Sequence, residues 1–138
     1  MNAPLYTTEI LRLATSLNEP HPLAREDGSA EARSPTCGSR VATAVQLDDE
    51  GRVAALSQQV HACAFGQASA ALLEKGAMGR KRSEVNDAHD RLAAWLGGAE
   101  AEPDWGFNAL APARSRKSRH SAILLPFRAL VTAMEAAA

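Results

Sequence analysis

Residues 41–76 read VATAVQLDDEGRVAALSQQVHACAFGQASAALLEKG, and this stretch decides the fold class. In residues 41–47, β-branched and leucine side chains at the odd positions alternate with Ala42, Ala44 and Gln46 at the even positions, which is typical of a half-buried strand. Asp48-Asp49-Glu50-Gly51 follows with turn chemistry, because glycine readily adopts a positive φ. Residues 52–62 then form a second strand-like run, with apolar side chains at Val53, Leu56 and Val60. We therefore predict a β-hairpin.

The period of the sequence changes to helical at Cys63. Phe65, Ala68 and Leu72 share one helical face, and Gly76 closes the pattern. A helix therefore follows the hairpin directly, with Cys63 at the junction between strand and helix.

Three further segments flank this hairpin and helix. Residues 10–17 show helical spacing, which Pro20 ends because the residue before a proline avoids helical geometry. Residues 29–34 are short and alanine-rich, and we expect them to form an edge strand beside the hairpin. Residues 85–96 form a second helical pattern, which Gly97-Gly98 stops.

A last helical pattern lies close to the end of the sequence. Pro126 is costly inside a helix but harmless in the first turn, so we expect this helix to begin near Leu124 or Leu125. His120 and Ser121 would then lie just ahead of it.

These elements predict an α+β fold: an N-terminal helix, a three-stranded antiparallel sheet, and then helices packed on one face. The 138 residues fit one domain over residues 1–138. Because 46% of the residues are hydrophobic but only 4% are aromatic, we expect small and aliphatic side chains on closely packed helices to build the core.

The overall charge disfavours two classes of partner. A formal net charge of −1 gives no long-range attraction to nucleic acid or to an anionic membrane. The N-terminus has no basic region followed by an apolar run, and no 18 consecutive apolar residues occur. We therefore expect a cytoplasmic protein.

The two cysteines are 26 positions apart, which is too sparse for a disulfide framework and does not match a zinc finger. Cys37 lies between Pro35 and Gly38 in a loop that presents its side chain. Cys63 lies at a helix start, where unpaired amides favour the thiolate that ligates metals. Two presented thiolates would form a soft-metal site. The alternative is that both are ordinary buried thiols.

Two features precede the last helix. His120 could supply a third metal ligand through a neutral ring nitrogen, although a single histidine beside an arginine is more often a surface or capping residue. A basic cluster, defined here as Arg114, Arg116, Lys117 and Arg119, has two interpretations: a docking surface for an acidic protein, or a solvated loop.

Three short segments resemble one known family. They are Ser-Pro-Thr-Cys37-Gly-Ser, Ala62-Cys63-Ala-Phe-Gly66-Gln-Ala-Ser-Ala70 and His120-Ser121-Ala-Ile-Leu124. In order and context they resemble the motif regions of the IscU/NifU/SufU-like iron-sulfur cluster assembly scaffolds. The resemblance covers most of the chain, and the first two segments together are fairly specific.

The resemblance implies a ligand set. Cys37 and Cys63 match the first two family cysteines, which ligate a nascent [2Fe-2S] cluster or, in some members, zinc. His120 matches a histidine that part of the family carries beside the third cysteine. Cys37, Cys63 and His120 are therefore the expected ligands of the cluster or metal, and no catalytic residue is expected.

Two positions depart from the family pattern. Ser39 stands where the family usually has aspartate, which removes a carboxylate ligand. Ser121 stands at the third cysteine, which the family links to receiving persulfide sulfur, and a serine hydroxyl is not a sulfur acceptor. The resemblance therefore implies no sulfur acceptor at position 121.

The sequence thus predicts a scaffold or carrier for iron or a [2Fe-2S] cluster rather than an enzyme. The implied partners are a cysteine desulfurase and apo-protein acceptors, and a homodimer would bring four thiolates to one interface. One alternative is a divergent zinc-binding or protein-interaction module of the same fold. Another is a sulfurtransferase that accepts persulfide on Cys63.

Overall fold

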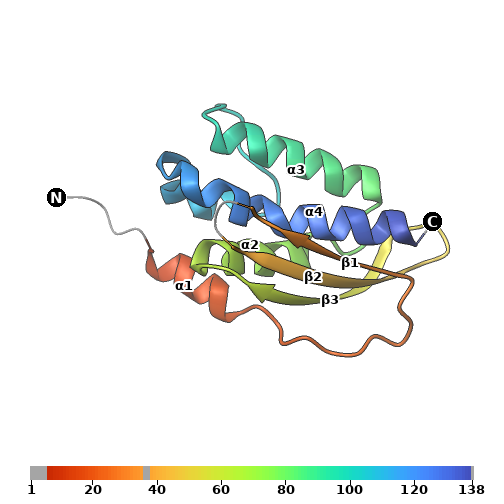
Figure 1. The fold of residues 1–138 in the computed structure, drawn as a ribbon. Helices are drawn as coiled ribbons and strands as arrows, with labels where there is room; N and C mark the ends of the chain where they lie inside the picture. The colour runs from red at the N-terminus through yellow and green to blue at the C-terminus, as the bar shows by residue number, and fades with distance from the viewer. Residues whose placement is uncertain (1–5, 36–37, 138) are drawn as a thin grey trace.

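The computed structural model describes residues 6–35 and 38–137. Its elements follow one another along the chain as shown in Figure 1, and they are α1 (Thr8–Thr15), β1 (Gly28–Arg33), β2 (Arg40–Leu47), β3 (Val53–His61), α2 (Ala64–Gly76), α3 (Arg82–Leu96), the 3-10 helices η1 (Phe107–Ser115) and η2 (Lys117–Arg119), and α4 (His120–Ala136).

The three strands form one antiparallel sheet in the order β1-β2-β3. The turn between β2 and β3 is held by the Asp48 carboxylate, which accepts hydrogen bonds from the backbone N–H groups of Glu50 and Arg52, each at 2.9 Å. Gly51 adopts a φ of +79°, as the turn chemistry predicts. The predicted hairpin and the predicted edge strand are both confirmed.

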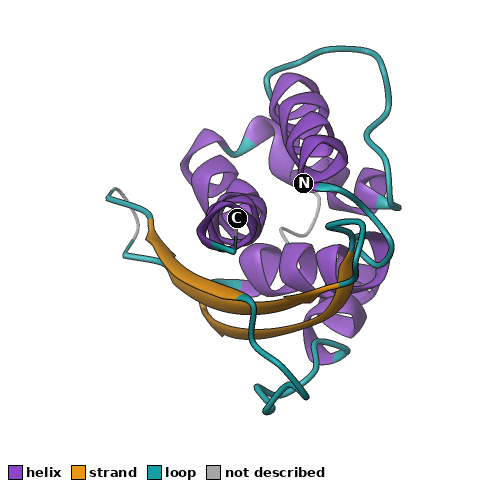
Figure 2. Cartoon of the chain, turned by 90° about the vertical axis from the view of Figure 1, so that its right-hand side faces the viewer, coloured by secondary structure: helices purple, strands orange, loops and turns teal. Residues whose placement is uncertain are grey.

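The helices pack together on one face of the sheet, as Figure 2 shows. α4 crosses β1 and β2, α2 lies beside α4, and α3 covers α4 from the side away from the sheet. α1 packs on α2, and the ring of Tyr6, just before α1, lies 5.0 Å from the Phe65 ring in α2. The predicted α+β class is therefore confirmed.

Aromatic residues are few, but several of them meet at one point of the core. The buried ring of Phe127 in α4 stacks on Trp105 at 5.5 Å and contacts Phe107 at 5.3 Å. Around this cluster the core is aliphatic, with Leu73, Leu92 and Leu130 fully buried, among others. The loop that carries Trp105 and the start of η1 at Phe107 are thereby fastened to α4.

The predicted start of the last helix was wrong. α4 begins at His120, so Pro126 lies inside the helix and both His120 and Ser121 belong to its first turn. A proline at this place removes the hydrogen bond that the carbonyl of Ala122 would otherwise accept within the helix. This part of α4 is buried against α2, and burial of its apolar face outweighs the local cost of the proline.

An extended segment, residues 16–27, runs from α1 along the sheet to β1 (Figure 1). Backbone and side-chain groups fasten this segment at three places. Asn18 donates two hydrogen bonds to the carboxylate of Glu74 in α2, at 2.8 and 3.3 Å, and the N–H of His21 donates to the Ser57 hydroxyl at 2.9 Å. The Asp27 carboxylate accepts from the N–H of Leu47 at 2.7 Å.

The Glu74 anchor predicts a pH dependence of stability. Burial raises the pKa of Glu74 above its ordinary 4.5, and the hydrogen bonds from Asn18 only partly oppose this. The folded state then holds the proton to a higher pH than the unfolded state, so the contribution of Glu74 to the free energy of unfolding falls as the pH rises past about 4.5. We expect the stability of Glu74→Gln relative to the wild type to increase from acidic to neutral pH in urea titrations.

Glu84 provides the control with the opposite sign. The backbone N–H of Lys81 lowers the pKa of Glu84, which helps to cap α3, so its contribution is present above its ordinary pKa and lost on acidification. Glu84→Gln should therefore become less stable relative to the wild type as the pH rises. If the stability difference from the wild type changed with pH in the same direction for both variants, the assignment of the Glu74 effect to burial would be contradicted.

No helix among residues 6–35 and 38–137 has the length and apolar character needed to cross a membrane.

Candidate functional site

Three segments that are far apart in the sequence meet where α2 and α4 begin. The hydroxyl oxygens of Ser34, which follows β1, and Ser121 in α4 are 2.9 Å apart and share a hydrogen bond. Gly66 in the first turn of α2 lies so close to α4 that a Cβ there would be 3.3 Å from the carbonyl oxygen of Ala122. The loop after β1 and the starts of both helices therefore form one end of the molecule.

Cys63 is the N-cap residue of α2, with φ −66° and ψ 173°. Its thiol is free and half-exposed, and its side chain makes no capping hydrogen bond. Ser, Thr, Asp and Asn are the residues that stabilise this position, and cysteine is not among them. Helix capping therefore does not explain the presence of a thiol here.

The loop between β1 and β2 has closely tied ends. The N–H of Ser34 donates to the carbonyl of Ser39 at 2.8 Å, and the N–H of Gly38 donates to the carbonyl of Ser34 at 3.3 Å. Gly38 has a φ of +72°, which a residue with a side chain adopts only with strain. Thr36 and Cys37 lie outside the described residues, so the prediction that Cys37 is a ligand stays a prediction.

His120 is the first residue of α4 and is half-buried. Its Nε2 lies 2.8 Å from the carbonyl oxygen of Ala113 in η1. A carbonyl only accepts, so Nε2 must carry the proton, and in the neutral ring Nδ1 then has the free lone pair. Metal-binding histidines are commonly oriented in this way, by a hydrogen bond from one ring nitrogen to a backbone carbonyl.

The two serines that depart from the family pattern are placed differently. Ser39 is 6% exposed at the end of the loop. Ser121 is half-buried, and its hydroxyl is engaged with Ser34. The hydroxyl of Ser121 therefore serves to join the loop to α4.

Two residues of the second sequence segment pack α2 on α4, a role that sequence reasoning missed. Gly66 allows the close approach to Ala122, and the buried Ser69 hydroxyl donates to the carbonyl of Ile123 at 2.5 Å. The carbonyls of Ala122 and Ile123 both lie in α4 in the turn before Pro126. The signal was present in the sequence, because small residues at i and i+3 on a helix allow another backbone to approach closely.

The basic cluster divides into one structural residue and three others. Arg114 donates hydrogen bonds to the carbonyls of Trp95 and Ala99, each at 2.9 Å, and its guanidinium lies 4.9 Å from the centre of the Trp95 ring. Arg114 therefore fastens η1 to the end of α3. Arg116 and Lys117 are exposed, and Arg119 is half-exposed.

Within residues 6–35 and 38–137, no three side chains of His, Cys, Asp or Glu are grouped so that they could hold a metal ion. Cys63 and His120 are the described members of the predicted ligand set, and Cys37 is outside this range. A complete site would thus need Cys37 or a group from another molecule.

Comparison with solved structures decides the family. The N-terminal part of a NifU-like protein from Brucella abortus superposes with a TM-score of 0.84 and 30% sequence identity, over 95% of this chain and 92% of that one. This chain belongs to the IscU/NifU/SufU-like family of iron-sulfur cluster assembly scaffolds. The resemblance predicted from the three short segments is confirmed.

A second structure shares the fold of this family member. The protein assigned as iron-sulfur cluster assembly scaffold of the SUF system in Fervidobacterium islandicum superposes with a TM-score of 0.79 and 19% identity, over 94% of this chain and 96% of that one. No protein-family model and no curated protein matches the sequence.

Proposed function

We propose that this NifU-like chain acts as a scaffold or carrier that holds iron or a [2Fe-2S] cluster transiently. The single observation that carries the proposal is the meeting of the loop after β1, the start of α2 and the start of α4. The hydrogen bond between Ser34 and Ser121 joins residues 87 positions apart in the sequence, and Cys63 and His120 begin the two helices concerned.

The proposed ligands are Cys37, Cys63 and His120. Thiolates suit iron and iron-sulfur clusters, and a neutral imidazole suits iron and zinc. Cys63 contributes a half-exposed thiol that α2 does not use for capping. His120 contributes Nδ1, because its Nε2–H is held by the carbonyl of Ala113.

The proposed cargo can leave as well as bind. Three protein ligands leave a fourth position for solvent or for a partner, and Ser39 supplies no carboxylate there. Incomplete protein ligation favours transfer over storage, which is what a scaffold needs. Ser121 stands at the position of the family's third cysteine, and its hydroxyl already bonds Ser34. The proposal therefore does not include sulfur acceptance at this position.

The proposed partners are a cysteine desulfurase, which would supply sulfur, and apo-proteins that would receive the cargo. A homodimer would bring two pairs of cysteines together and could complete the ligand set. We propose no catalytic residue, since the role of the chain is to hold and release its cargo.

Anaerobic reconstitution with ferrous iron and sulfide tests the ligand set. His120→Gln retains an amide N–H in the place of Nε2–H, so the hydrogen bond to Ala113 and the helix start should survive while the Nδ1 ligand is lost. We expect the variant to bind about 10- to 100-fold more weakly, or to release its cluster correspondingly faster to a chelator, with an unchanged circular dichroism spectrum.

Three results would contradict the proposal. Unchanged iron and sulfide contents in His120→Gln would remove His120 from the ligand set. Unchanged contents in Cys37→Ala would remove Cys37. Stoichiometric zinc, together with a failure to take up iron and sulfide, would favour the zinc-binding module instead.

A further inference from the structure

The segments that build the candidate site contain no acidic side chain. Residues 32–47, 51–73 and 105–134 make up half of the chain, yet none of its 16 Asp and Glu residues lies in them. The same three segments hold eight of the 15 Lys and Arg residues. In a protein whose net charge is −1, this is a strong separation of charge.

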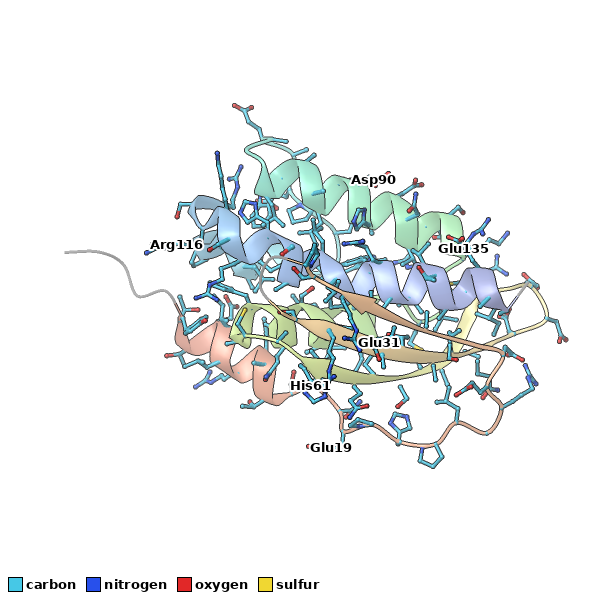
Figure 3. All side chains as sticks on the ribbon, viewed as in Figure 1. Glu19, Glu31, His61, Asp90, Arg116 and Glu135 are labelled. Atoms are coloured by element: carbon cyan, nitrogen blue, oxygen red, sulfur yellow. The ribbon has the colours of Figure 1, made fainter. Side chains whose placement is uncertain are left out.

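The fold turns this separation along the sequence into a separation in space. Asp48, Asp49 and Glu50 form the turn at the end of β2 that is remote from the loop after β1. Glu135 lies in the last turn of α4, about 22 Å from its start by the rise of an α-helix. Figure 3 shows Glu135 and Arg116 at opposite ends of the molecule.

The cations at the site end differ in their availability. Arg114 is committed to two carbonyls and the Trp95 ring, and Arg33 pairs with Glu31 at 2.6 Å. Arg40, Arg116, Lys117 and Arg119 make no ion pair within the described part of the chain. We call these four residues the cationic rim.

The cationic rim borders the site. Arg40 follows Ser39 directly and opens β2. Arg116, Lys117 and Arg119 precede His120, whose ring is fixed against η1. Three carboxylates also border this end: Glu9 in the first turn of α1, Glu31, which pairs with Arg33 and lines a hollow with Arg40, and Glu100, which follows the Ala99 carbonyl that Arg114 binds. Together with Arg33 and Arg114, the rim sets six cations against these three carboxylates and leaves this end positive.

We propose that the cationic rim docks an acidic surface of a partner protein that exchanges cargo at Cys63. The inference rests on the proposed function for the identity of the cargo, but the docking itself needs no metal. A positive end on a weakly negative protein attracts and orients an acidic protein surface, which raises the rate of productive encounters. The acidic turn at the other end opposes docking in the reverse orientation.

A protein fits this surface better than a nucleic acid does. Four cations can contact phosphates, but without an exposed aromatic platform they lack the base stacking of a single-strand binding groove. Trp95 and Phe107 are buried, and Trp105 is stacked on Phe127. Carboxylates on a folded partner need only the charge complementarity that the rim offers.

An octaglutamate peptide serves as the probe, with the reduced 138-residue chain free of metal. We expect amide chemical shifts to change around Arg40, Cys63 and residues 116–121, and the binding to weaken as salt rises. The double variant R116E/K117E should bind the peptide at least about tenfold more weakly than the wild type does. R82E/R128E is the matched control, because it changes the net charge equally at exposed positions outside the rim, and it should bind within about twofold of the wild type.

The outcomes separate this inference from the proposed function. Equal weakening in the two double variants, or shifts spread over the surface, would overturn the docking site. Tight binding of an octathymidine oligonucleotide with no binding of octaglutamate would also overturn it, in favour of nucleic acid. The peptide should bind Cys63→Ala normally, so a failure of metal binding in that variant leaves the docking test intact.

Discussion

Replacing Cys63 by serine is expected to remove nearly all of the iron and sulfide that the chain takes up on anaerobic reconstitution. A serine hydroxyl is not readily deprotonated and is a poor ligand for iron-sulfur clusters. The same change should leave the fold intact or stabilise it by about 0.5–1 kcal/mol, because serine can cap α2 and Cys63 makes no capping hydrogen bond. Iron and sulfide analysis, read beside urea unfolding, measures both effects.

A relocated thiol is the matched control for this variant. In the double variant Cys63→Ala with Ala64→Cys, the number of thiols is unchanged, but the sulfur moves by one position and thus by about 100° around the helix axis. We expect cluster binding to stay lost. Recovery in the relocated variant, or full loading of Cys63→Ser, would show that the position of Cys63 has no part in holding the cargo.

Replacing Phe127 by alanine is expected to lower the free energy of unfolding by about 3–5 kcal/mol, which is a large part of the stability of a domain of this size. The Phe127 ring is fully buried in α4 and contacts both Trp105 and Phe107. Its removal leaves a cavity and frees the loop that precedes η1. Urea unfolding followed by circular dichroism measures the loss.

The adjacent Arg128 provides the control for the Phe127 variant. Arg128 is exposed on the same helix, so Arg128→Ala should change the stability by no more than about 0.5 kcal/mol. A loss below about 1 kcal/mol in Phe127→Ala would show that the core closes around the missing ring. The three-ring cluster would then not be what fastens the loop to α4.

Hydrophobic periodicity was sufficient for most of the fold. The hairpin, α2 and α3 follow from side-chain patterns within ten to fifteen residues, and these patterns are dictated by which face of an element is buried. The edge strand was harder to predict, because Gly28–Arg33 is short and has small inward-facing residues. It forms because β2 supplies its hydrogen-bond partners and α4 covers it.

The start of α4 could not be predicted from local rules. Pro126 argues for a helix that begins late, since proline is unfavourable in a helix interior. The first turns of α4 are nevertheless helical, because Ile123, Leu125 and Phe127 bury their side chains between the sheet and the other helices. Tertiary burial outweighed a local preference of a few kcal/mol.

By itself, the sequence determined the α+β class and the family resemblance, and it supplied Cys37, Cys63 and His120 as candidate ligands. Only the tertiary structure decided that Ser34 meets Ser121, that Ala113 orients the His120 ring, and that Arg114 is a packing residue while Arg116 and Lys117 stay exposed. The physical reason is one of range. Periodicity and turn chemistry act between neighbours along the chain, whereas a site is assembled by helix packing between residues tens of positions apart.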